Sequence, residues 1–81
     1  MNEEARKQME QRMEELSGLI TAYPLYIPIH KAAEFLHMKE DGLRASIEQG
    51  NCLFGLCWRT GERMAYKIPT VTFVRWYAKG A

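Results

Sequence analysis

Two prolines, Pro24 and Pro28, most constrain how this chain of 81 residues can fold. Proline fixes its own φ and pushes the residue before it toward extended backbone, so residues 19–28 are expected to form an extended connector. A chain of this length buries only about 60–65% of the surface that it exposes when unfolded, which leaves room for one small core. We therefore expect an N-terminal helical segment over residues 1–20 and one compact domain over residues 21–81.

Residues 2–17 have the apolar spacing of an amphipathic helix. Apolar side chains recur at steps of three or four residues and form one stripe: Ala5, Met9, Met13, Leu16 and Ile20. Asn2 is a candidate N-cap, and Gly18 is a candidate stop. The stripe either packs on the domain's own core or forms the seam of a homodimer. The repeat lasts about two heptads, which is short for a coiled coil.

Residues 29–37 and 41–49 have the spacing of two short helices joined by a tight turn, a helix-turn-helix unit. In the second helix, Asp41 is a candidate N-cap and Gly50 a candidate stop. The expected inward positions of the two helices are Ile29, Ala32, Ala33, Leu36, Leu43 and Ile47.

Residues 52–58 and 63–68 predict a β-hairpin, with Gly61 supplying a positive φ in the connection. A Thr60-Gly61 loop would pair Cys57 with Met64, Gly55 with Tyr66 and Leu53 with Ile68, so that Gly55 makes room for the Tyr66 ring. The other face would carry Phe54, Leu56 and Trp58. That face is apolar for an exposed surface, so either the register differs or the N-terminal helix or a partner covers it.

Thr70 is a candidate cap for a last helix over residues 71–79, which follows Pro69. The predicted elements give a mostly α fold with a small β-hairpin, of the α+β class. Their order, two short helices, a hairpin and a closing helix, is the layout of a winged helix-turn-helix domain, here with an extra N-terminal amphipathic helix.

Several segments also resemble one family. Residues 29–36 read IHKAAEFL, residues 43–50 read LRASIEQG, residues 66–69 read YKIP and residues 73–77 read FVRWY. Together they resemble the excisionase and mercury-resistance-regulator (MerR) type of winged helix-turn-helix DNA-binding domain, over residues 27–79. The family often has glycine in the turn between the two helices, where this chain has His37, so that histidine would have to adopt the left-handed conformation.

The resemblance implies binding to double-stranded DNA, with the second helix in the major groove and the hairpin, or wing, against the backbone or minor groove. Gln49 could read adenine, and Arg44 could read guanine or hold a phosphate. Asp41 and Glu48 would repel phosphate. The full set of candidate contacts is Lys31, Lys39, Arg44, Gln49, Arg59, Thr60, Arg63 and Lys67. Any single one of these could instead be a solvated charge.

Net charge is only +1, but residues 1–17 carry a balance of −2 and residues 18–81 one of +3. With so few cations a monomer would bind DNA weakly, so useful affinity needs a cooperative array of copies or a homodimer. The expected role is a recombination directionality factor that works with an integrase or other recombinase, or a transcription regulator. It would act in the cytoplasm of a bacterium, on the chromosome or a mobile genetic element.

The alternative is a protein-interaction adaptor on the same scaffold, which does not bind DNA itself. The near-neutral charge and the acidic residues of the second helix favour it. Its interaction face would include Met9, Met13, Leu16, Phe54 and Trp58.

Other functions find little support in the residues. The charged first residues predict no signal peptide, and no apolar stretch is long enough to span a membrane. Cys52 and Cys57 are expected to stay reduced, and with His30 and His37 they have poor spacing for zinc. No catalytic motif is present, so we expect no enzymatic activity, no cofactor, no metal and no small-molecule ligand.

Overall fold

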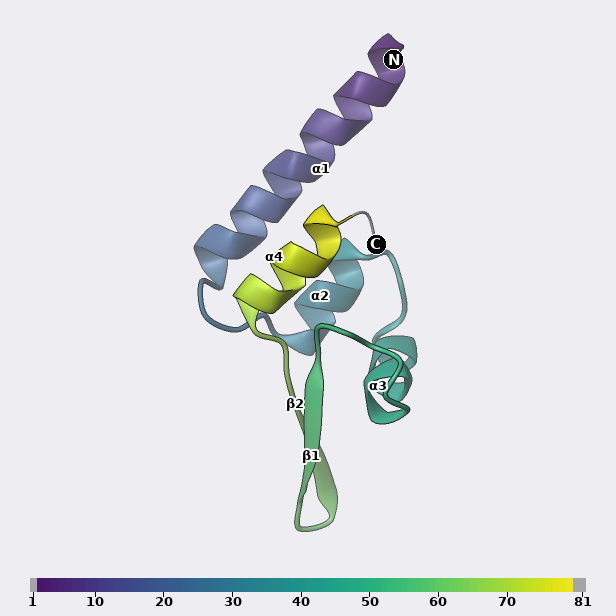
Figure 1. The fold of residues 1–81 in the computed structure, drawn as a ribbon, viewed down its shortest axis with the longest axis vertical. Helices are drawn as coiled ribbons and strands as arrows, with labels where there is room; N and C mark the ends of the chain where they lie inside the picture. Colours follow the sequence, from purple (N-terminus) through teal and green to yellow (C-terminus); the bar gives the residue numbers. More distant parts are fainter. Residues whose placement is uncertain (1, 80–81) are drawn as a thin grey trace.

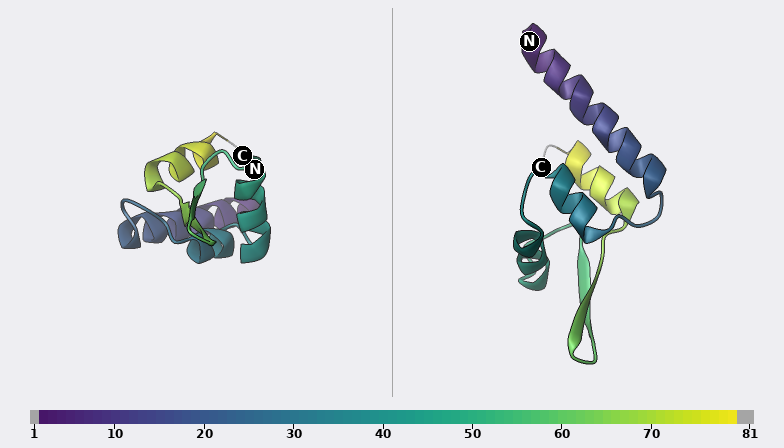
Figure 2. Two further views of the ribbon diagram at one scale, coloured as in Figure 1. Left: turned by 90° about the horizontal axis from the view of Figure 1, so that it is seen from below. Right: turned by 180° about the vertical axis from the view of Figure 1, so that it is seen from behind.

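The computed structural model describes residues 2–79 and shows a mixed α/β fold. Across those residues, four helices and one two-stranded antiparallel hairpin follow one another (Figure 1): α1 Glu3–Ala22, α2 Ile29–Phe35, α3 Glu40–Glu48, β1 Leu56–Thr60, β2 Arg63–Lys67 and α4 Thr70–Ala78. The hairpin projects from one end of the body and α1 from the other, in front and back views alike (Figure 2). The molecule is therefore elongated, with extents of 51 × 23 × 19 Å.

Helix α1 begins where the sequence predicts and ends later. The side chain of Asn2 accepts a hydrogen bond of 2.7 Å from a backbone amide of the first turn, which confirms Asn2 as the N-cap. The predicted stop at Gly18 is wrong, because the helix continues to Ala22. Glycine inside a helix costs only about 1 kcal/mol relative to alanine, which packing of the last turns can outweigh. Pro24 ends the helix, because it forces Tyr23 out of helical backbone.

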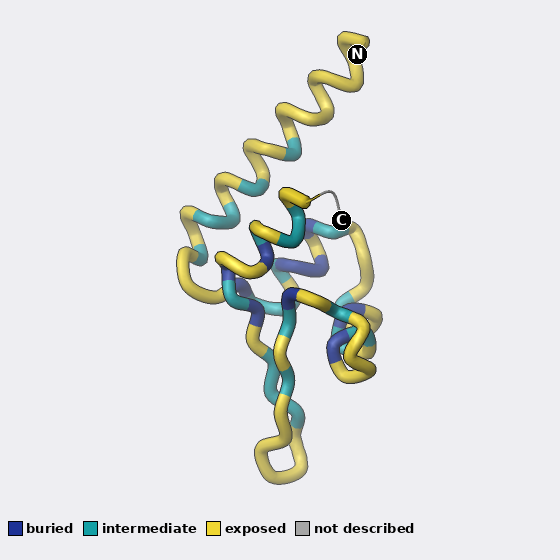
Figure 3. Tube along the Cα trace, viewed as in Figure 1, coloured by how far each residue is buried: buried dark blue, intermediate teal, exposed yellow. Residues whose placement is uncertain are grey.

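The predicted apolar stripe of α1 is divided between two environments. Leu16 and Leu19 pack against the core, so the C-terminal end of the stripe is covered by the chain itself. Met9 and Met13 are 48% and 64% exposed, and no residue within Glu3–Ala22 is buried (Figure 3). The N-terminal half of the helix lies outside the body.

The turn between α2 and α3 is held by a histidine in the left-handed conformation. His37 has a φ of 57°, as its position in the turn predicts. The amides of His37 and Met38 donate to the carbonyl oxygens of Glu34 and Ala33 at 3.1 and 3.0 Å, which closes the end of α2. Gly50, with a φ of 76°, follows α3 and confirms the predicted stop.

Two predicted helix caps are wrong. Asp41 lies inside the first turn of α3, and the cap position is Lys39, which makes no side-chain capping bond. Thr70 is the first residue of α4 rather than the residue before it. Its buried hydroxyl donates to the carbonyl oxygen of Tyr23 at 2.6 Å and so fastens the connector to α4.

The connector also pairs with the chain that follows β2. The amide of Ile27 donates to the carbonyl oxygen of Ile68 at 2.9 Å, and the amide of Thr70 donates to that of Leu25 at 3.0 Å. These bonds satisfy backbone groups that would otherwise have no partner on burial. They hold the connector beside the base of the hairpin.

Aromatic rings dominate the core between the helices. The Phe73 ring is fully buried and meets the rings of Phe35 and Phe54 edge-on, with centroids 5.8 and 5.0 Å apart. Phe54 is only 4% exposed and precedes β1, so its predicted places on a hairpin face and in an interaction face are wrong. The other buried apolar residues are Ile27, Ala32, Ala33, Leu43, Ile47 and Ile68.

The hairpin register differs by two residues from the predicted one. The observed pairs are Leu56 with Lys67, Cys57 with Tyr66, Trp58 with Ala65, Arg59 with Met64 and Thr60 with Arg63. The loop is therefore Gly61-Glu62 instead of Thr60-Gly61. Gly61 has a φ of 64°, and glycine is favoured at the first position of such a loop. A shift of two residues leaves each side chain on its predicted face.

Gly55 makes room for a different neighbour than the sequence predicts. A Cβ atom at this position would lie 2.8 Å from Cδ1 of Ile47, so α3 approaches the backbone directly. The predicted role, space for the Tyr66 ring, is wrong because Tyr66 pairs with Cys57 and β1 begins only at Leu56.

Candidate nucleic-acid interface

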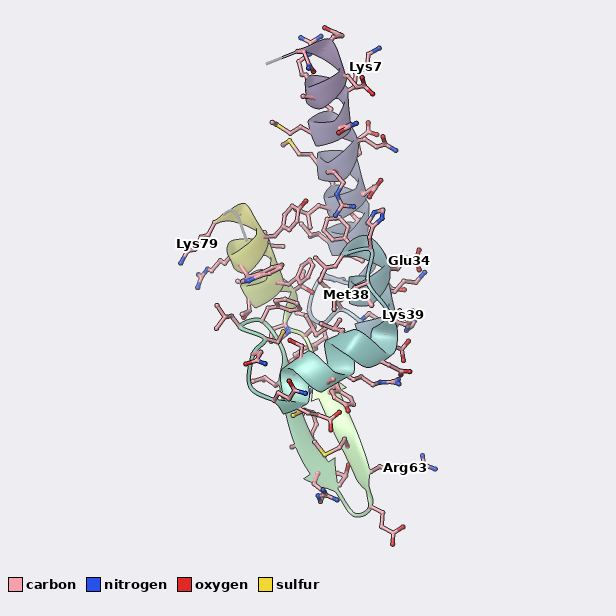
Figure 4. All side chains as sticks on the ribbon, turned by 90° about the vertical axis from the view of Figure 1, so that its right-hand side faces the viewer. Lys7, Glu34, Met38, Lys39, Arg63 and Lys79 are labelled. Atoms are coloured by element: carbon pink, nitrogen blue, oxygen red, sulfur yellow. The ribbon has the colours of Figure 1, made fainter. Side chains whose placement is uncertain are left out.

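The end of the hairpin carries the most accessible group of predicted DNA contacts. Arg59, Thr60 and Arg63 are all exposed, at the end of the molecule opposite to α1 (Figure 1). The Arg63 side chain extends away from β2 into open space (Figure 4). Among the residues that the structure describes, neither arginine pairs with a carboxylate. Both cations are therefore free to meet a phosphate.

Strand alternation divides the three hairpin cations between two faces. Arg59 shares a face with Cys57 and Tyr66, and that face turns toward α3. Arg63 and Lys67 lie on the opposite face with Leu56 and Trp58, which are 57% and 43% exposed. The cations meet only at the hairpin end, where Arg59 and Arg63 flank the loop.

Arg44, the predicted base-reading arginine, is engaged within its own helix. Its guanidinium contacts the carboxylate of Glu40 one turn earlier and lies 3.6 Å from that of Asp41. The same group lies 5.8 Å from the centre of the Tyr66 ring. Arg44 is half exposed, and both carboxylates are partly or fully open to water, so these ion pairs are weak and exchangeable.

Glu48 and Tyr66 link α3 to the hairpin. The phenol oxygen of Tyr66 donates to Oε2 of Glu48 at 2.5 Å. This hydrogen bond raises the pKa of Tyr66 above its usual value of 10, because ionisation would place a phenolate beside a carboxylate. The bond fixes the angle between the helix and the hairpin and occupies a carboxylate that would otherwise face a phosphate.

Lys39 and Gln49 stand at the two ends of α3. Lys39 is exposed in the turn before the helix (Figure 4), and Gln49 is exposed at its C-cap. The amide oxygen of Gln49 accepts a hydrogen bond of 3.3 Å from Asn51. Between them, residues 40–48 carry three carboxylates against Arg44 alone. The carboxylates of α3 thus lie at its two ends, next to Lys39 and Gln49, and the only charged residue between them is Arg44.

Lys31 is not brought together with the other predicted contacts. It is half buried and lines an open groove between α1 and α2, with Glu15, Glu34 and His37 among its neighbours. The groove lies on the side of the body away from the hairpin end. Lys31 therefore does not share a surface with Arg59 or Arg63.

Lys67 is placed over an aromatic ring at the base of the hairpin. Its ammonium nitrogen lies 4.4 Å from the centre of the Tyr26 ring, a cation–π contact between the connector and β2. Both residues remain exposed. Sequence reasoning does not find this pair, because the connector has no periodicity that places it beside β2.

Arg12 makes a further interaction that the sequence does not indicate. Its Nη2 atom donates to the carbonyl oxygen of Phe35 at 2.7 Å, and its guanidinium carbon lies 4.0 Å from the centre of the Phe35 ring. Phe35 ends α2, where free carbonyl oxygens favour a nearby cation. Arg12 thus fixes α1 to the body.

The side chains that could bind a metal, and the two cysteines, are spread along residues 2–79. Over that range, no three His, Cys, Asp or Glu side chains gather as metal ligands, and both cysteines are unpaired. Among the helices described, none is both long enough and apolar enough to cross a membrane.

Comparisons with protein-family models, with curated proteins and with solved structures returned no match to this chain.

Proposed function

We propose that this protein is a small DNA-binding protein of the winged helix-turn-helix type, related to excisionases. It acts without enzymatic chemistry, as a recombination directionality factor or a transcription regulator. Helices α2 and α3 supply the helix-turn-helix, and the β1–β2 hairpin supplies the wing. The observation that carries this proposal is the pair of exposed arginines, Arg59 and Arg63, at the end of a hairpin that projects beside α3; neither pairs with a carboxylate among residues 2–79.

The wing leads the contact with DNA. Arginines that flank a short loop suit the narrow, electronegative minor groove, and the Thr60 hydroxyl can bond a phosphate between them. Helix α3 approaches the major groove with its ends, where Lys39 and Gln49 are exposed. The carboxylates of Glu40, Asp41 and Glu48 repel phosphate and so limit how closely the helix can lie against the backbone.

A monomer brings few cations to DNA, so its binding is weak and salt-sensitive. Rising salt lowers the affinity in proportion to the number of phosphates that the protein neutralises, and the free arginines of the wing supply most of this effect. Binding by more than one copy is the direct way to gain affinity without adding cations to the chain. This fits a protein that bends or marks DNA for a recombinase instead of reading a long site alone.

The test is binding of the full chain to mixed-sequence duplex DNA by fluorescence anisotropy, titrated from about 50 to 200 mM salt. The double change Arg59→Ala/Arg63→Ala is expected to weaken binding by at least about tenfold at the lowest salt. The matched control is Arg6→Ala/Lys7→Ala, which removes the same charge from the far end of the molecule (Figure 4). Equal reductions of affinity in the two variants, or none in the first, would refute the wing as the DNA contact.

A second candidate function, a protein-interaction adaptor, is favoured by two observations. Leu56 and Trp58 remain exposed on one hairpin face, and α3 carries three carboxylates against one arginine. Neither an exposed apolar face nor a helix rich in carboxylates is suited to binding the phosphates of a polyanion. Retention on heparin at low salt separates the two functions, since the DNA-binding protein is retained and the adaptor passes through.

A further inference from the structure

The hairpin carries a tryptophan that the core does not use. Trp58 is 43% exposed, and among residues 2–79 its ring pairs with no other aromatic ring and with no cation. Trp76 differs, because its ring packs against that of Phe54 with centroids 4.5 Å apart. Part of the Trp58 indole therefore faces solvent on a strand that holds it in place.

The strand register leaves the indole uncovered and places a cation on each side of it. Trp58 lies opposite Ala65, whose methyl group is too small to cover an indole. Its diagonal neighbours on β2 are Arg63, toward the loop, and Lys67, toward the base of the hairpin. Such neighbours lie about 7–8 Å apart, within reach of long side chains. The indole thus stands between two exposed cations.

A second aromatic ring continues this surface at the base of the hairpin. Tyr26 is 48% exposed, and its ring lies under the ammonium group of Lys67. The surface, called here the outer wing face, has one side chain of each of these residues: Tyr26, Leu56, Trp58, Thr60, Arg63 and Lys67. None of them is a carboxylate. The outer wing face therefore combines aromatic rings with a net positive charge.

Rings and cations in alternation match the chemistry of an unpaired nucleic-acid strand. Every base has a π-face that can stack on an aromatic side chain, and the phosphates between the bases pair with cations. A duplex keeps its base faces stacked on one another, so it cannot use the indole in this way. An acidic peptide would match the two cations, but each nucleotide also supplies the planar ring that an open indole can bind.

We infer that the outer wing face binds single-stranded DNA, with one base stacked on Trp58 and the adjacent phosphates held by Arg63 and Lys67. Arg59 lies on the opposite face of the hairpin, so this site is distinct from a duplex contact made through Arg59. Stacking on Trp58 does not require duplex binding. Only the choice of DNA over RNA rests on the proposed function, which brings duplex DNA to the same hairpin.

The test is binding of the full chain to oligothymidylate of about 12 nucleotides at low salt. Thymine strands do not pair with themselves, so binding to a duplex cannot contribute to the signal. Stacking on Trp58 should quench the tryptophan fluorescence of the wild-type protein. The quenching should disappear in Trp58→Phe, in which Trp76 is the only tryptophan left.

The affinity for labelled oligothymidylate is measured by fluorescence anisotropy. Trp58→Ala should raise the dissociation constant about tenfold or more, and Trp58→Phe, which keeps a ring, should raise it less. Leu53→Ala is the matched control, because Leu53 is 80% exposed and lies outside the outer wing face. No binding of oligothymidylate would overturn the inference, as would equal affinities of Trp58→Ala and Leu53→Ala. Tighter binding of oligouridylate would overturn the assignment to DNA.

Variants of single cations separate this site from the duplex contact. Lys67→Ala should weaken oligothymidylate binding more than Arg59→Ala does, because only Lys67 lies on the outer wing face. The reverse order would overturn the inference. Trp58→Ala should leave the affinity for duplex DNA unchanged. A protein that binds oligothymidylate through Trp58 but not the duplex would refute the proposed function alone, and one that binds the duplex but not oligothymidylate would refute this inference alone.

Discussion

At the scale of single residues, Gly55 is the position where one methyl group matters most. A Cβ atom there would lie 2.8 and 2.9 Å from two atoms of the buried Ile47 side chain. Gly55→Ala should therefore overpack the core and lower the free energy of unfolding by about 1–3 kcal/mol. Gly18→Ala is the control, because no described atom beyond its own helix lies within 4 Å of the new Cβ and alanine favours helix. Thermal unfolding should move down for Gly55→Ala and up for Gly18→Ala, and movement in the same direction would contradict the packing described.

Tyr66 reports on the contact between α3 and the hairpin. Its hydrogen bond to Glu48 raises the pKa of the phenol, so this bond stabilises the fold fully below pH 10, and the stabilisation disappears as pH rises through the raised pKa. Glu48→Gln should lower the Tyr66 pKa toward its ordinary value. The measurement is the tyrosinate absorbance titration of each protein minus that of its Tyr66→Phe counterpart. Glu62→Gln, an exposed loop carboxylate, should leave the titration unchanged, and an equal shift in both variants would exclude a specific bond.

At the scale of elements, local patterns predict helices and the hairpin but not their exact limits. The left-handed His37 and the stop at Gly50 follow from neighbours in sequence, and both are confirmed. Gly18 fails as a stop because distant packing holds the last turns of α1. Thr70 fails as a cap because its hydroxyl bonds Tyr23, 47 residues away. Contacts between residues far apart in the sequence decide where these helices begin and end, and helical periodicity carries no information about such contacts.

The candidate site is likewise predictable from the sequence only where local features decide it. Exposure of Arg59 and Arg63 at the end of a hairpin is predictable from their place beside a glycine-containing loop. The faces on which the hairpin cations lie depend on strand alternation, and the neutralisation of Arg44 depends on which rotamers its helix permits. Lys31 is absent from the predicted surface because α1 covers that side of α2, and no local pattern places α1 there.

Arg12 holds helix α1 against the body of the protein. Arg12→Met keeps the apolar stem but removes the charge and the hydrogen bond to the Phe35 carbonyl. We expect a decrease of about 1–3 kcal/mol in unfolding free energy and faster amide hydrogen exchange along α1. Arg6→Met removes an exposed arginine that pairs with Glu3 in the same helix, and it should change stability by less than about 0.5 kcal/mol. Equal effects of the two changes would show that Arg12 does not hold the helix.

At the scale of the whole molecule, the chain separates two charged surfaces by its full length. The net −2 of residues 1–17 lies at the α1 end, and the free arginines lie at the hairpin end. The helix that carries most of the carboxylates of the chain is thereby kept away from the end proposed to meet a polyanion.

The proposed wing predicts how the salt dependence of DNA binding changes when its arginines are removed. The logarithm of the binding constant falls with the logarithm of salt concentration by about 0.9 for each phosphate contacted. Removing Arg59 and Arg63 should therefore reduce the slope by about 2 for each bound chain. Arg6→Ala/Lys7→Ala removes the same charge from α1 and should leave the slope unchanged. Anisotropy titrations of both variants on the same duplex measure this, and equal slopes in the two variants would mean that the wing arginines do not contact phosphate.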